Sequence, residues 1–147
     1  RYNFCSYDVF LIPFLFLWCC YSCSLEPRIA IPTELRTELK KHHNYRNYIY
    51  LMNQAIDTND PINLSSFLSI NYFNDPSTGA EHGKILLKIL IQKGDSSFFK
   101  ALKLANHVEL SNIKAYMLIG IDNQERDIDY YITSYPKSFA YLQSDHW

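Results

Sequence analysis

The chain has 147 residues and a net charge of -1, with 48% hydrophobic, 16% aromatic and 20% charged residues. This balance is typical of neither a disordered polyelectrolyte nor a basic nucleic-acid-binding protein, so we expect no nucleic-acid partner. The length suits one domain with one hydrophobic core. Four glycines and six prolines are few for a turn-rich β-sandwich or for a glycine-built phosphate loop.

Residues 1–24 differ in composition from the rest of the chain. They contain all four cysteines, and residues 9–21 form an apolar run without a charged side chain. A permanent transmembrane helix needs about 20 apolar residues, whereas the apolar part of an export signal spans about 7 to 15. The run therefore predicts an export signal. The alternatives are a retained membrane anchor, as in an integral membrane protein, and an apolar helix packed into the domain.

Two kinds of processing suit residues 1–24. Signal peptidases require small side chains near the bond that they cut, and Ser22, Cys23 and Ser24 precede Leu25. A cut there would release a periplasmic or secreted protein. The segment around Cys23 also resembles the lipobox of bacterial lipoproteins, which implies a lipidated Cys23 and a membrane-anchored chain. No cysteine follows residue 23, so disulfides are not expected, which favours a bacterial periplasmic or surface protein.

Helical patterns begin after a short extended segment. Residues 25–33 carry two prolines and predict an extended tether. Thr33 is the expected N-cap of one long helix over residues 34–57, because apolar side chains recur there mostly every three or four residues. Residues 42–44 interrupt this apolar stripe and are its weakest point.

The later helices have clear start and stop signals. Asp60 and Asp75 each precede a proline, which is the arrangement of an N-cap followed by proline at the first helical position. Gly94 is the expected C-cap of the second of these helices, and Asp95 the expected N-cap of the next helix. The predicted helices pair in chain order as 61–73 with 76–93, 96–106 with 109–121, and 124–135 with 137–143.

These patterns together predict an all-α fold over residues 34–147, as a single helical domain. Pairs of neighbouring helices form antiparallel hairpins, and the hairpins assemble into an irregular bundle or a short stack that resembles helical-repeat proteins in architecture.

The histidines and the remaining polar residues do not form a recognisable catalytic or metal motif. His42 and His43 are adjacent, so on a helix their side chains point about 100° apart and cannot both bind one ion. His82 has no second histidine nearby. We expect all three on a solvated surface, and we predict no metal site, cofactor or catalytic residue. A small metal-dependent enzyme that uses His42, His43 or His82 is the alternative.

Lysines and tyrosines provide the candidate interaction surface. Residues 84–114 are mainly basic, whereas residues 51–83 and 115–147 are mainly acidic, so the lysines of the basic block suit an acidic partner. Tyrosine suits protein interfaces because it has an apolar ring and a polar tip. Tyr48 and Tyr50 cannot both face the core with Ile49, so at least one of them is exposed. The candidate surface residues are Tyr48, Tyr50, Lys84, Lys88, Lys100 and Lys103.

The sequence thus predicts an exported or surface-anchored helical module with a protein partner, which binds or has a structural role rather than acting as an enzyme. Contact with a membrane is expected only through residues 1–24.

Overall fold

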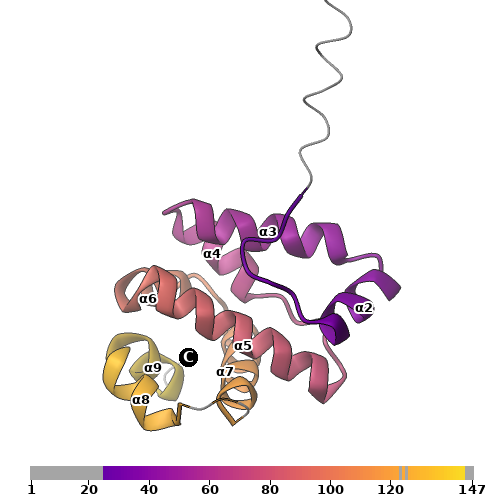
Figure 1. The fold of residues 1–147 in the computed structure, drawn as a ribbon. Coiled ribbons are helices and arrows are strands. Elements are labelled where there is room, and N and C mark those ends of the chain that lie inside the picture. Colours follow the sequence, from indigo (N-terminus) through magenta and orange to yellow (C-terminus); the bar gives the residue numbers. More distant parts are fainter. Residues whose placement is uncertain (1–24, 123, 125, 145–147) are drawn as a thin grey trace, which may run out of the picture.

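The computed structural model describes residues 25–122, 124 and 126–144 (Figure 1). These residues are helical or irregular, and none of them lies in a strand. The prediction of an all-α fold is therefore confirmed. The expected export signal, including Cys23, lies outside the described residues.

Eight helices follow one another in the described part of the chain. Their starts follow the local signals, since the Asp60 carboxylate accepts a hydrogen bond from the backbone N–H of Ile62, and the Asp75 carboxylate accepts one from Thr78. The helices are α2 (Thr33–Lys41), α3 (Tyr45–Asp57), α4 (Pro61–Leu68), α5 (Pro76–Lys93), α6 (Asp95–Leu102), α7 (His107–Asp122), α8 (Ile128–Ser134) and α9 (Pro136–Gln143).

The predicted long helix over residues 34–57 is two helices, so this expectation is wrong. The chain turns at the point where the apolar stripe is interrupted. His43 adopts φ 58°, a left-handed conformation that an α-helix of L-residues does not contain. The backbone N–H of Asn44 donates to the Leu39 carbonyl at 2.8 Å and closes the turn. Thr33 is also not an N-cap, since it is the first residue of α2 and no side chain caps that helix.

The expected pairing of helices in chain order is largely wrong. Helix α5 packs most extensively on α7, α3 packs on α4, and α4 and α9 both pack on α6. Figure 1 shows α5 in the middle, with α3 and α4 above it and α7 below it. Of the three predicted pairs, only the last, α8 with α9, makes extensive contact. The arrangement is closer to an irregular bundle than to a stack of successive hairpins.

The segment before α2 is part of the packed structure. Ile31 is buried in the core, and the Arg28 side chain forms an ion pair with Asp57 at the end of α3, at 3.0 Å. The backbone N–H of Arg28 also donates to the Asn53 side chain. The segment is irregular, with a bend at residues 28–29, and these contacts hold it against α3.

Asp95 caps a different helix from the one expected. Gly94 is the N-cap of α6, and the Asp95 carboxylate makes no capping bond to α6. It accepts hydrogen bonds from the backbone N–H groups of Lys137, at 3.0 Å, and Ser138, at 2.8 Å, in the first turn of α9. Because these N–H groups lack partners within their own helix, the carboxylate joins the start of α6 to the start of α9.

Candidate functional site

Two glycines bring α5 and α7 into direct backbone contact. A Cβ atom added to Gly83 would lie 1.9 Å from the carbonyl oxygen of Tyr116, and one added to Gly120 would lie 2.6 Å from the carbonyl carbon of Gly83. Only glycine fits at such a distance. This close crossing places the Tyr116 ring against the buried face of α5.

A cluster of aromatic rings surrounds His82 at this crossing. The rings come from four parts of the fold: Tyr48 from α3, Phe67 from α4, Phe73 from the connection between α4 and α5, and Tyr116 from α7. Their centroids lie 4.8 to 5.7 Å from that of His82. We call these five residues the His82 cluster.

His82 is completely buried, so the expectation of a solvated surface position is wrong. A hydrogen bond of 2.9 Å joins its Nδ1 to the Tyr48 hydroxyl, and Nε2 has no partner among the described residues. Burial lowers the pKa of the imidazole to about 3, so His82 is neutral at pH 7. Burial also raises the pKa of Tyr72, next to the cluster, to about 12, and its hydroxyl has no partner among the described residues either.

The surroundings of His82 give it a packing role. A general base or a metal ligand must reach a substrate or an ion, whereas this imidazole is completely buried beside rings from α3, α4, α7 and the connection before α5. The sequence contained a signal for this burial. His82 is three, four and seven residues before Ile85, Leu86 and Ile89, so it continues the buried face of α5.

The structure does not bring the three histidines together. The Nε2 of His42 lies 2.9 Å from the Glu38 carboxylate, and His43 is exposed at the turn between α2 and α3. Within residues 25–122, 124 and 126–144 there is no group of three or more His, Cys, Asp or Glu side chains placed to hold a metal ion. None of the helices formed by these residues is both long and apolar enough to span a bilayer.

The six candidate surface residues do not form one surface. Tyr48 is buried in the His82 cluster, so its assignment to an interaction surface is wrong. Tyr50 is 51% exposed, which agrees with the prediction that at least one of these two tyrosines is exposed. Tyr48 points inward because it lies three residues before Leu51 and four before Met52, on the face of α3 that packs against the core.

The four lysines among these candidate residues differ in their exposure and in their interactions. Lys84 forms an ion pair with Glu81 at 2.7 Å, and both side chains are about one quarter exposed. Lys88 is exposed on the same helix. Lys100 and Lys103 are exposed on and just after α6, and the Lys103 ammonium lies 4.9 Å from the centre of the Phe99 ring. Among the described residues, Lys100 has no ion-pair partner.

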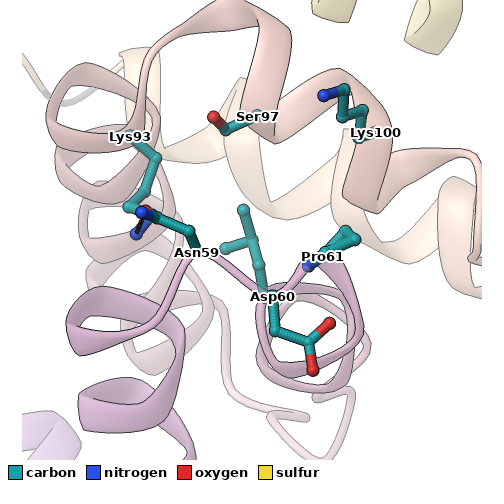
Figure 2. Close-up of a pocket in the computed structure, with 7 residues that line it drawn as sticks. Asn59, Asp60, Pro61, Lys93, Ser97 and Lys100 are labelled. Atoms are coloured by element: carbon teal, nitrogen blue, oxygen red, sulfur yellow. Dashed lines mark hydrogen bonds between the residues drawn. The ribbon is translucent and has the colours of Figure 1, made fainter.

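A hollow of about 260 Å³ lies beside Lys100, between the start of α4 and the start of α6 (Figure 2). Figure 2 shows Ser97 and Lys100 of α6 on one side, facing Asn59 and Pro61 on the other. The complete lining is Asn59, Asp60, Pro61, Leu64, Lys93, Ser97 and Lys100.

Most charges in this hollow are already used within the fold. The Lys93 ammonium donates to the carbonyl oxygens of Ile56 and Thr58 and to the Asn59 side chain, at 3.1, 2.5 and 3.4 Å. It therefore caps the end of α3. The Asp60 carboxylate caps α4. Lys100 is thus the charge that remains available to a ligand in this hollow.

A second, more open hollow of about 320 Å³ lies further along α4, where the chain passes from α6 to α7. Two of its lining side chains are aliphatic and exposed, since Ile62 is 63% and Leu104 54% exposed. The Glu109 carboxylate is engaged, since it accepts a hydrogen bond from the backbone N–H of Asn106. The lining consists of Ile62, Ser65, Ser66, Ser69, Leu104 and Glu109.

The two hollows share no lining residue, but both are lined by α4 and by the stretch of chain that runs from α6 to the start of α7. We call the two hollows together the α4–α6 groove. It has a basic, polar end at Lys100 and an aliphatic end at Leu104. Of the candidate residues from the sequence, it contains Lys100 alone.

The aliphatic end of the groove was not predicted from the sequence. Ile62 lies in the first turn of α4, and Leu104 lies between α6 and α7. An apolar residue in such a place has no periodic pattern that assigns it a face.

Comparisons of the chain with protein-family models, with curated proteins and with solved structures find no match.

Proposed function

We propose that this protein is a binding module and that the α4–α6 groove holds a segment of a partner protein. The segment would place aliphatic side chains against Ile62 and Leu104 and a carboxylate against Lys100. The observation that carries the proposal is that two exposed aliphatic side chains, those of Ile62 and Leu104, line one hollow. Aliphatic side chains grouped on a polar surface are typical of binding sites for protein partners.

The partner chemistry follows from the two ends of the groove. Burying two aliphatic side chains against apolar groups removes apolar surface from water, which favours binding. The Lys100 ammonium has no ion-pair partner among the described residues, so it favours a partner carboxylate through charge complementarity. The carboxylates of Asp60 and Glu109 are held by backbone N–H groups, and they oppose this preference less than free carboxylates would.

A peptide selection tests this proposal. Random ten-residue peptides displayed on phage are selected on the immobilised full-length protein. We expect enrichment of peptides that combine Asp or Glu with Leu, Ile or Val. A synthetic enriched peptide should lose at least tenfold in affinity on Leu104→Ser or Ile62→Ser. Lys100→Glu should weaken its binding and shift the selected peptides from acidic to basic.

Matched controls lie on the exposed side of α5. Ile91 is 44% exposed and Lys88 is exposed, and neither lines the groove. Ile91→Ser and Lys88→Glu should therefore leave the affinity within about twofold. If no peptide is enriched, or if the control variants weaken binding as much as the groove variants, the proposal is wrong.

We also propose that the protein is exported and that residues 1–24 direct it. The apolar run at 9–21 and the small residues before Leu25 support this. Intact-mass measurement on the membrane and soluble fractions of a bacterial host tests it. A lipid-modified Cys23 at the start of the chain supports an anchored lipoprotein, and a chain that begins at Leu25 supports a released form. An uncut chain beginning at Arg1 in either fraction contradicts cleavage.

A further inference from the structure

We propose that His82 is an acid-sensitive lock that holds α3 and α4 against α5 and α7 only while its imidazole is neutral. This inference does not depend on the proposed binding function. It rests on the position of His82, which is the contact point of three other helices and of the connection before α5.

The groups that face His82 provide nothing to stabilise a positive charge. They are the rings of Tyr48 from α3, Phe67 from α4, Phe73 from the connection, and Tyr116 from α7. No carboxylate is among them. On α5 itself, the nearest charged residues, Glu81 and Lys84, pair with each other. Burial raises the pKa of Tyr48 and of Tyr116, so these tyrosines stay neutral in acid.

The hydrogen bonds give a second reason. In a neutral imidazole one ring nitrogen is a donor and the other an acceptor, and the Tyr48 hydroxyl pairs with Nδ1 at 2.9 Å. Protonation makes both ring nitrogens donors. The Nε2 atom has no acceptor among the described residues, so the protonated ring would hold a buried, unpaired donor together with a positive charge. Such a group is strongly destabilising.

The ring takes up its proton readily only where water can reach it, and this requires α3 and α4 to move away from α5. Tyr48 and Phe67, which enclose the ring on that side, lie 5.1 Å apart between their centroids. They would move together. Burial holds the pKa of His82 near 3 in the closed form, against 6.5 for an ordinary histidine. Opening is therefore favoured progressively as the pH falls below 6.5.

Hydrogen exchange on the free full-length protein tests the lock. Backbone amides of α3 and α4 are followed by mass spectrometry from pH 7 to 4.5, with rates corrected for the intrinsic effect of pH. We expect the opening equilibrium constant of these helices to rise about tenfold per pH unit below pH 6. A constant that does not change with pH in this range would overturn the proposal.

A double substitution tests whether the acid-dependent opening comes from protonation of His82 or from protonation of carboxylates. Tyr48→Phe with His82→Phe replaces both hydrogen-bonding partners by rings of similar shape, which is the change least costly to the core. We expect this variant to fold and to lose the acid-dependent opening. His42→Gln, at an exposed position, should leave the acid-dependent opening unchanged. A double variant that opens in acid as wild type does would contradict the proposal.

If the double variant does not fold, nuclear magnetic resonance on the wild-type protein tests whether His82 stays neutral in the folded state. The Cε1–H signal of His82 in the folded state should keep its neutral position down to pH 5, while a second set of signals from the open form grows in. A folded-state signal that titrates with a midpoint near 6.5 would overturn the proposal.

Discussion

Residues on α5 have environments that follow from helical geometry. His82, Leu86 and Leu90 are spaced by four and are all fully buried, whereas Lys88 lies two residues from Leu90 and is exposed. Residues two apart on a helix point in very different directions, and most of the circumference of α5 is packed, so only a narrow strip that includes Lys88 and Ile91 is in water. The position of a side chain on α5 therefore determines whether it is buried or solvated. His82 is on the buried side, and burial keeps its imidazole neutral at pH 7.

Leu90→Asp should be severely destabilising, whereas Lys88→Asp should change the free energy of unfolding by less than about 1 kcal/mol. The first substitution buries an unpaired carboxylate and costs about 3 kcal/mol or more. The second alters a solvated charge. Urea unfolding of both variants followed by circular dichroism measures the difference. Equal losses of stability would contradict the assigned faces of α5.

The free energy of unfolding should fall as the solution is acidified. Burial lowers the pKa of His82 to about 3 in the folded protein from 6.5, so the unfolded chain binds the extra proton between these values. The stabilisation is complete above pH 6.5 and is lost as the pH falls toward 3. Between pH 7.5 and 5.5 the loss is about 1.4 kcal/mol. Urea titrations at both values measure it, and equal midpoints would contradict it.

Contacts between elements depend on backbone groups as much as on side chains. Gly83 and Gly120 allow α5 and α7 to touch, and Asp95 on α6 supplies hydrogen-bond acceptors to α9. The Lys93 ammonium on α5 acts as a hydrogen-bond donor instead, because it donates to the last backbone carbonyls of α3. The Asp95 and Lys93 interactions join helices at ends where their own hydrogen bonds stop, whereas the glycine contact sets how closely α5 and α7 approach.

Gly83→Ala should destabilise the protein by about 3 kcal/mol or more, since the new methyl group would lie 1.9 Å from the Tyr116 carbonyl oxygen and would push α7 away from α5. Gly79→Ala is the matched control on the same helix. Its methyl group would meet the flexible Tyr116 ring at 3.3 Å, and the better helix propensity of alanine offsets that strain. We expect its effect to stay within about 1 kcal/mol. Thermal unfolding compares the two.

Asp95→Ala should cost about 1 to 2 kcal/mol, because it removes the acceptor for two backbone N–H groups at the start of α9. The loss should be local, so hydrogen exchange should become faster in α9 than in α6. Asp129→Ala, on the exposed side of α8, is the control and should have an effect within about 0.5 kcal/mol. Faster exchange in α6 alone would show that Asp95 caps its own helix.

The whole described molecule is organised around one cluster of buried side chains that draws on every helix from α2 to α9. The aromatic rings are spread across it, with Tyr48 and His82 near α5 and Tyr131 and Phe139 in the last two helices. Parts of a fold that share one core unfold together. The groove, by contrast, lies where this core leaves aliphatic side chains uncovered.

Urea unfolding at pH 7.5 should give one transition. Helix content, from far-ultraviolet circular dichroism, and tyrosine packing, from the near-ultraviolet signal, should change at the same urea concentration. Two separate midpoints, with hydrogen exchange showing α8 and α9 opened first, would contradict a shared core.

The sequence alone determined the secondary structure and the exposure of many residues. Helical spacing and capping are local properties, so Asp60, Asp75 and Gly94 marked helix ends without knowledge of the fold. It also showed that Tyr48 and Tyr50 cannot share a face, although not which of them is buried. The weak point at residues 42–44 was visible too, but whether it breaks a helix depends on what the two halves pack against.

Only the tertiary structure decided which helices meet. The partners of α5 and α6 are set by shape over the whole core, such as the fit of Gly83 against Gly120, and no local pattern encodes that fit. The same holds for Asp95, whose carboxylate caps a helix more than forty residues away. Burial of His82 was readable from its helical face, but the rings around it come from distant segments. Its neutral state and the groove beside Lys100 therefore follow from packing and not from sequence spacing.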